Sequence, residues 1–276
     1  MKKLNRVLSL SAAAALALSL TACSGGTSGT ADTPAANNTS ASTGGSGDTY
    51  TVAVIKQMDH ASLDEIADAI AARLDEIAAE NGITIQYEVT SGQGDQTVLR
   101  QLADQAIADG VDAIIPIATT AAQVAAVSAE ESQTPVVFAA ISYPETADLT
   151  GIDYVTGTSD ALDTNLILDM MLAQNPELQS VGLLYSLSEP NSEVPIADAK
   201  AYLDEKGIAY TEATANTNDE VIAAASSLIA DGVDAVFTPT DNIIMAAELA
   251  IYEDFINAGI PHYTGADSFV RNGAFA

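Results

Sequence analysis

Apolar residues along the chain follow two alternating patterns. Short apolar runs, of which residues 51–55 are the first, predict buried strands, and stripes with helical spacing predict amphipathic helices between them. At the start of the first stripe, Ser62 and Glu65 have the spacing of a capping box. Strands that alternate with helices of this length predict right-handed βαβ units and therefore parallel sheets.

The predicted elements continue in this alternation to residue 264. Strands are expected at residues 51–55, 83–89, 111–118, 135–140, 181–185, 208–213, 233–238 and 260–264. Helices are expected at residues 62–81, 96–108 with Asp95 as cap, 120–131, 194–206 and 242–258, with one that ends near Pro176 and one that Thr217 and Glu220 open. Residues 151–160 are predicted as a crossover, and Pro190 and Asn191 as part of a loop.

A seven-residue sequence occurs twice in the chain. Residues 107–113 and 229–235 both read Ile-Ala-Asp-Gly-Val-Asp-Ala, and each copy ends an amphipathic helix and begins an apolar strand. Gly110 and Gly232 stand where the end of a helix favours a residue that tolerates positive φ. The surrounding elements also repeat in order, which predicts two copies of one α/β unit. The expected fold class is α/β, with two doubly wound, Rossmann-like lobes at residues 50–150 and 151–276.

The first residues have the features of a targeting segment. A basic start and an apolar stretch lead to Leu-Thr-Ala-Cys at residues 20–23, which resembles a bacterial lipobox and predicts lipidation of Cys23. The alternative is an ordinary secretory signal with a free thiol. Residues 24–49 are small and polar, and predict a disordered tether with a reach of roughly 25–30 Å.

Charge limits the possible partners. The formal net charge is −29, and only nine Lys and Arg residues are present. Nucleic acids and anionic surfaces attract proteins with an excess of positive charge, so no nucleic-acid partner is expected.

The strand order predicts where a ligand binds. In open parallel sheets, ligands lie outside the carboxyl ends of the strands, next to loops and helix N-termini. This rule selects the following residues: Gln57, His60, Thr119, Thr120, Ser142, Tyr143, Tyr185, Asn191, Asp241, Asn242 and Asp267.

The chemistry of these candidates is mixed. Hydroxyls and helix N-termini suit a carboxylate, Asp241 and Asp267 suit an ammonium, and Tyr143 and Tyr185 suit an apolar side chain. Some of them, such as Thr119 and Asp241, are equally well explained as ordinary helix caps.

Motifs for catalysis and metal binding are not evident. His60 and His262 lack metal-site spacing, and no nucleophile-elbow sequence is found. The prediction is therefore a protein that is not an enzyme and that uses neither a metal nor another cofactor.

Several segments from residue 51 onward resemble the ABC-transporter substrate-binding proteins assigned to tryptophan and tyrosine uptake. They are residues 54–64, 118–123, 138–144, 156–160, 181–185, 188–192, 241–242, 260–261 and Asp267. The resemblance implies a periplasmic-binding-protein type I fold, in which a hinge joins two lobes that enclose the ligand.

The chain also departs from the family pattern. Ser142-Tyr143-Pro144 stands where relatives often have Thr-Asp-Pro, and Ser186 where they often have Asn, so the pocket chemistry is expected to differ. The family continues beyond the position of Ala276 through another strand, helix and hinge crossing. The second lobe is therefore expected to lack its C-terminal elements.

The function implied is that of a lipid-anchored, extracytoplasmic binding protein that delivers a small amino acid-like ligand, expected to be aromatic, to an ABC permease. Lobe closure around the ligand is the expected mechanism. The alternatives are a sensory module that presents the closed form to a receptor, a site for a sugar or nucleoside, and an enzyme with Asp241 or Asp267 as base.

Overall fold

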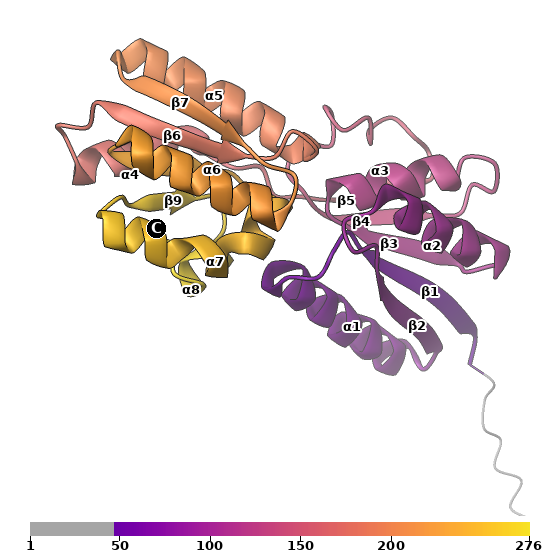
Figure 1. Ribbon diagram of the computed structural model, residues 1–276. Helices are drawn as coiled ribbons and strands as arrows, with labels where there is room; N and C mark the ends of the chain where they lie inside the picture. The colour runs from indigo at the N-terminus through magenta and orange to yellow at the C-terminus, as the bar shows by residue number, and fades with distance from the viewer. Residues whose placement is uncertain (1–46) are drawn as a thin grey trace, which may run out of the picture. The chain divides into compact units, whose positions relative to one another are not determined.

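Two parallel β-sheets organise residues 47–276, the part of the chain that the computed structural model describes (Figure 1). The predicted signal segment 1–23 with Cys23, and residues 24–46 of the predicted tether, lie outside the described residues. From residue 47 to residue 276, no helix has both the length and the apolar character needed to cross a bilayer.

The first sheet has the strand order β2-β1-β3-β4-β5, with parallel pairing throughout. Its strands are β1 Thr49–Lys56, β2 Thr84–Ser91, β3 Ala113–Ile117, β4 Val136–Ile141 and β5 Val155–Ser159. Its helices are α1 Ala61–Asn81, α2 Gln96–Ala108 and α3 Thr119–Ser128. The neighbours Val54 and Ile55 point to opposite faces. Val54 packs with Leu63 of α1, whereas Ile55 packs with Leu99 of α2 and Ala121 of α3, so α1 covers one face and α2 and α3 the other.

The second sheet has the order β7-β6-β8-β9 and is also parallel. Its strands are β6 Ser180–Tyr185, β7 Ala209–Thr214, β8 Ala235–Thr238 and β9 His262–Thr264. Its helices are α4 Thr164–Gln174, α5 Pro190–Lys206, α6 Asn218–Asp231, α7 Asn242–Ala258 and α8 Asp267–Arg271. Leu183 packs with Leu203 of α5 on one face, and Leu184 packs with Leu228 of α6 and Phe255 of α7 on the other. The two sheets with their helices are the two lobes, which confirms the predicted α/β class.

The seven-residue repeat has the same structural role in both lobes. Asp112 Oδ2 accepts a hydrogen bond of 2.7 Å from the Thr51 N–H near the start of β1. Asp234 Oδ2 likewise accepts one of 2.9 Å from the Ser180 N–H at the start of β6. Each copy therefore secures the amino end of the neighbouring strand. This end lies opposite the carboxyl ends at which ligands are expected.

Predicted helix ends are confirmed at several positions. Asp95 caps α2 by accepting from the Thr97 N–H at 2.6 Å, and Thr217 caps α6. Gly110 and Gly232 have φ of 73° and 69°, the left-handed conformation that favours glycine after a helix.

Strand β5 extends the first sheet past the predicted boundary between residues 150 and 151. Residues 151–160, predicted as a crossover, contain this strand, which pairs with β4. Gly157 lies so close to β4 that a Cβ there would come within 2.2 Å of the Phe138 carbonyl oxygen. Because β5 is an edge strand of mostly exposed polar residues, it lacks the apolar run that marks the other strands.

Two helices begin at residues other than those predicted. The predicted loop at Pro190 and Asn191 is wrong, because α5 starts at Pro190, and proline is favourable at the first helical position. The predicted capping box is also wrong. Helix α1 starts at Ala61 after His60, so Ser62 lies inside its first turn. Helix α8, five residues long, was not predicted.

Candidate ligand-binding site

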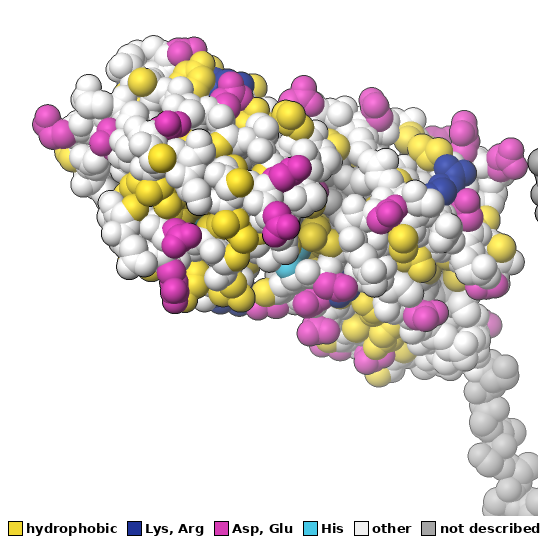
Figure 2. Space-filling model, in the orientation of Figure 1, with side chains coloured by type: hydrophobic (Ala, Val, Ile, Leu, Met, Phe, Trp, Pro, Cys, Tyr) yellow, Lys and Arg dark blue, Asp and Glu magenta, His cyan; other side chains and the backbone are white. Residues whose placement is uncertain are grey.

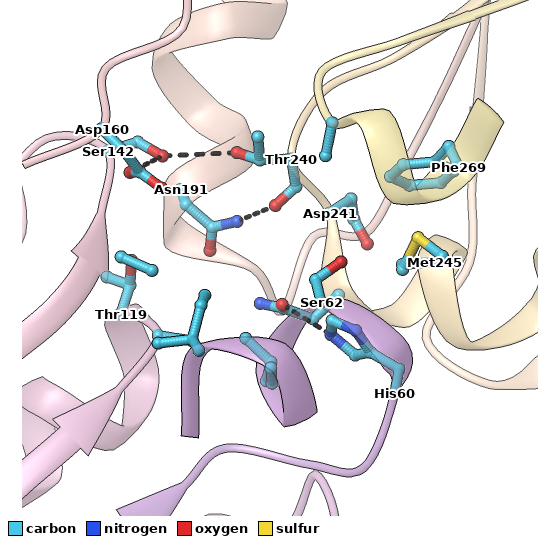
Figure 3. A pocket seen from close by; sticks show the side chains of 16 residues that line it. His60, Ser62, Thr119, Ser142, Asp160, Asn191, Thr240, Asp241, Met245 and Phe269 are labelled. Carbon is cyan, nitrogen blue, oxygen red and sulfur yellow. Dashed lines mark hydrogen bonds between the residues drawn. The ribbon is translucent and has the colours of Figure 1, made fainter. Parts of the chain in front are cut away.

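A cavity of about 80 Å³ lies between the lobes, next to the carboxyl ends of strands from both sheets (Figure 3). The first lobe contributes His60, Ser62, Leu63, Ile66, Ala118, Thr119, Ala140, Ser142 and Asp160. The second contributes Asn191, Thr240, Asp241, Asn242, Met245, Ala266 and Phe269. Small-molecule pockets commonly measure about 300–1,000 Å³, so this cavity is smaller than that range and has no room for a peptide or oligosaccharide.

Two alanines at the cavity have positive φ. Ala118, directly after β3, has φ of 77°, and Ala140, near the end of β4, has φ of 58°. Such values are uncommon for residues with a side chain, and they are concentrated at functional sites. Ala118 has no side-chain oxygen to cap α3, and Gln57 Oε1 accepts from one N–H of the first turn, that of Thr120. The first turn presents its other backbone N–H groups and Thr119 beside the cavity.

One end of the cavity is rich in hydrogen-bond acceptors. Ser142 Oγ lies 3.3 Å from both Asp160 Oδ1 and Thr240 Oγ1. Partial burial raises the pKa of Asp160. Asn191 Nδ2 donates to the Thr240 carbonyl oxygen at 2.6 Å, while its Oδ1 is buried without a partner. No Lys or Arg is among the described residues that line the cavity, so this end is suited to a ligand that brings donors or positive charge.

The opposite end is apolar. Met245 of α7 and Phe269 of α8 line it, and Leu63 and Ile66 of α1 add further apolar side chains to the lining of the cavity. In Figure 3, Met245 and Phe269 lie on the side away from Thr119, Ser142 and Asp160. The cavity therefore has a polar and an apolar end.

Glu189 joins the lobes through a buried network beside the cavity. Its Oε1 accepts from Gln57 Nε2 at 2.5 Å, and its Oε2 accepts from Asn242 Nδ2 at 2.6 Å. Asn242 Oδ1 lies 3.0 Å from His60 Nε2. Burial raises the pKa of Glu189 to about 8, and the negative charge of Asp241 adds to the increase. The network thus places a titratable group in the contact between the lobes.

Asp241 acts within the second lobe. Its carboxylate accepts from the Ser186 N–H and from Ser192 Oγ, both at 2.7 Å, and from the Ile244 N–H at 3.0 Å. It is fully buried. These bonds connect α7 to α5 and to the residue that follows β6. Most of the acceptor capacity of Asp241 is therefore used before any ligand binds.

The structure brings some of the predicted site residues to the cavity and places others elsewhere. His60, Thr119, Ser142, Asn191, Asp241 and Asn242 line the cavity. Gln57 and Thr120 lie behind it, with the Thr120 N–H donating to Gln57 Oε1 at 3.1 Å.

The remaining predicted residues are engaged away from the cavity. The Tyr143 hydroxyl donates to the Leu162 carbonyl oxygen at 3.1 Å, and the Tyr185 hydroxyl donates to Glu212 at 2.6 Å. The Asp267 side chain is 86% exposed and pairs with Arg271 at 3.1 Å.

Several residues at the site escaped prediction. Asp160 follows the unrecognised strand β5, and Glu189 precedes the helix start that was placed too late. Both belong to segments that carry the family resemblance, and this resemblance is the signal that could have identified them as site residues. Met245 and Phe269 occupy apolar positions of helices, and a helix pattern alone does not distinguish a pocket from a core.

This arrangement, with two α/β lobes around a cavity at their strand ends, defines a two-lobed ligand-binding protein of the type I periplasmic-binding-protein fold. The chain belongs to the family described as ABC transporter substrate binding protein, whose model matches residues 51–276. The family and the relatives below are binding proteins, not enzymes, in agreement with the prediction.

Three relatives illustrate the similarity. A tyrosine-binding protein of Clostridioides difficile (strain R20291) is 27% identical over 230 residues, which are 82% of this chain and 66% of the relative. The chain thus spans less than two thirds of that curated relative. The ABC domain from Streptococcus pneumonia in complex with L-Trp has a TM-score of 0.76 and 26% identity, over 82% of this chain and 77% of that one. The ligand-free, open structure of CD0873, a substrate binding protein with adhesive properties from Clostridium difficile, has a TM-score of 0.56 and 25% identity over the same shares.

Proposed function

We propose that this protein binds a single zwitterionic amino acid with an aromatic side chain between its lobes. The observation that carries the proposal is the division of the cavity into a polar end with an unpartnered acceptor, Asn191 Oδ1, and an apolar end at Met245 and Phe269. A sugar carries hydroxyls around most of its ring, and the base of a nucleoside carries ring nitrogens and exocyclic polar groups, so either would leave polar groups unpaired at the apolar end.

The polar end matches the two charges of an amino acid. Asn191 Oδ1 and the Asp160 carboxylate offer acceptors to an ammonium group. At the start of α3, Gln57 Oε1 accepts from the Thr120 N–H, and the Thr119 hydroxyl and the other N–H groups of the first turn are offered to a carboxylate. These residues replace Asp241 and Asp267 as our candidates for the ammonium site.

The relatives support the same ligand class. One is a tyrosine-binding protein and another was solved with L-Trp. Both ligands combine a zwitterionic backbone with a large aromatic ring. The apolar end of the cavity suits such a ring, because aromatic side chains and methionine sulfur make favourable contacts with it.

Closure of the lobes is the proposed mechanism. Direct contacts between the lobes, such as Gln57 with Glu189 and His60 with Asn242, indicate a closed arrangement. The higher TM-score with the L-Trp complex than with the open structure, at nearly equal identity, supports this interpretation. The ligand would favour closure because it contacts both lobes only in the closed state.

The cellular role follows from the family. Substrate-binding proteins of ABC transporters work outside the cytoplasm, and we propose that this chain delivers its ligand to a membrane permease. Lipidation of Cys23 would anchor it to the cell membrane, with the following residues as a tether. Acidic side chains are scattered over the visible face in Figure 2 and outnumber basic ones there, which agrees with the expectation that nucleic acid is not a partner.

Isothermal titration calorimetry of the purified protein against the amino acids tests the ligand class. We expect binding to aromatic amino acids, with ribose, glucose and adenosine as negative controls. Heat with a sugar or nucleoside, and none with any amino acid, would contradict the proposal.

Asn191→Ala is expected to weaken amino-acid binding by about 10- to 100-fold. The reason is that a hydrogen bond to a charged group contributes about 1.5–3 kcal/mol. Calorimetry measures the change. Asn81→Ala is the matched control, since Asn81 also donates to a backbone carbonyl, that of Ile77, but at the exposed end of α1. Equal affinities of the two variants would remove Asn191 from the proposed site.

A further inference from the structure

Two serine hydroxyls meet at the apolar end of the cavity. Ser62 Oγ, in the first turn of α1, is hydrogen-bonded to Ser268 Oγ in α8 of the other lobe. Ser268 Oγ also lies 3.6 Å from Met245 Sδ. Ser62 lines the cavity, whereas Ser268 is 2% exposed and lies behind it. A polar group is thus held in place among the side chains that form the apolar end.

The surroundings make the hydroxyl of Ser62 distinctive. Leu63, Ile66, Met245 and Phe269 offer no conventional hydrogen-bond donor, and only the weakly accepting sulfur of Met245. Two other polar side chains lie near Ser62 in Figure 3, and both are engaged: Asp241 accepts three hydrogen bonds within the second lobe, and His60 Nε2 is bonded to Asn242 Oδ1. With Ser268 donating to Met245 Sδ, Ser62 donates to Ser268, and the lone pairs of Ser62 remain free. Ser62 can therefore accept a hydrogen bond from a ligand group that reaches this end. Figure 3 shows Ser62 between the polar residues and Met245 with Phe269.

We propose that Ser62 determines specificity by selecting a ring that carries a hydrogen-bonding group, such as a phenol hydroxyl, over a ring of hydrocarbon alone. This inference rests on the proposed function. A site that holds a buried polar group rejects an analogue that leaves the group unpaired, and it does so more strongly than an apolar pocket rejects a change of size. Ser268 lies behind the cavity and does not contact the ligand.

L-Tyrosine and L-phenylalanine test the proposal, because they differ by one hydroxyl. Titration calorimetry of the wild-type protein is expected to show tighter binding of tyrosine. In Ser62→Ala, the ratio of the two affinities is expected to fall by about tenfold, which corresponds to the loss of one hydrogen bond. The ratio is the useful measure, since loss of a contact between the lobes alone weakens both ligands equally.

Two further variants separate selection from closure. Ser268→Ala removes the same contact between the lobes but no group that lines the cavity, so both affinities are expected to fall in parallel. Ser226→Ala is the matched control, because the Ser226 hydroxyl donates only to the Ile222 carbonyl oxygen on the exposed side of α6. Equal binding of tyrosine and phenylalanine by the wild type, or an unchanged ratio in Ser62→Ala, would overturn the role of Ser62. Binding of neither amino acid would contradict the proposed function itself.

Discussion

Asp241→Ala is expected to lower the free energy of unfolding by about 3–5 kcal/mol. The substitution leaves two backbone N–H groups and the Ser192 hydroxyl without their common acceptor, and each buried unpaired group costs about 1–3 kcal/mol. It also removes the cap of α7. Urea unfolding followed by circular dichroism measures the change.

Asp267→Ala is the matched control for this prediction. Asp267 is also an aspartate beside the start of a helix in the second lobe, but its side chain is 86% exposed. Exposed ion pairs contribute about 0–1 kcal/mol, so its unfolding curve is expected to stay close to that of the wild type. If Asp241→Ala unfolded like the wild type and lost only ligand binding, Asp241 would instead belong to the ligand site.

Ligand affinity is expected to fall by roughly tenfold between pH 6.5 and pH 8. Burial between the lobes raises the pKa of Glu189 to about 8, whereas in an open protein water restores the ordinary value near 4.3. The closed state therefore binds an extra proton in this range. Closure is favoured at low pH, and the advantage is lost as the pH rises towards 8.

The network contains an acceptor for that proton. If the Asn242 amide turns over, its Oδ1 accepts from protonated Glu189 and its Nδ2 donates to neutral His60. Burial lowers the pKa of His60, so closure releases a proton from this group and is favoured as the pH rises. This effect is confined to the range below about pH 6.5. Measurements above that pH therefore isolate the effect of Glu189.

Calorimetry at pH 6.5, 7.25 and 8 tests the pH dependence. Glu189→Gln, which imitates the protonated acid, is expected to show the same affinity at all three values. Glu193→Gln is the control, since Glu193 lies one turn further along α5. It is expected to keep the wild-type dependence. A flat profile for the wild type would show that Glu189 gains no proton on closure.

The fold followed closely from the sequence because its signals are local and repeated. Apolar runs predicted most of the strands, and the two Ile-Ala-Asp-Gly-Val-Asp-Ala segments identified the lobes as two copies of one α/β unit. β5 was missed because an edge strand buries little, so Thr156 and Thr158 carry no apolar signal.

The site was less predictable because the end of a strand determines where a residue lies but not the direction in which its side chain points. Tyr185 ends β6 as expected, yet its hydroxyl reaches Glu212 on the neighbouring strand. Glu189 follows Ser188 in a polar segment, where a carboxylate is ordinarily solvated, yet it is 3% exposed and bonded to Gln57 of the first lobe. Such long-range effects are absent from the local pattern.

The duplicated unit bears on how ligand range can evolve. The start of α3 is left open at Thr119, whereas the corresponding start of α7 is occupied by the side chain of Asp241. Both residues are buried, but substitutions at residue 241 lose three hydrogen bonds of the second lobe and are therefore filtered by stability more strongly than substitutions at residue 119. New ligand preferences are therefore expected to arise through the first lobe more readily than through the second, although both lobes are built from the same α/β unit.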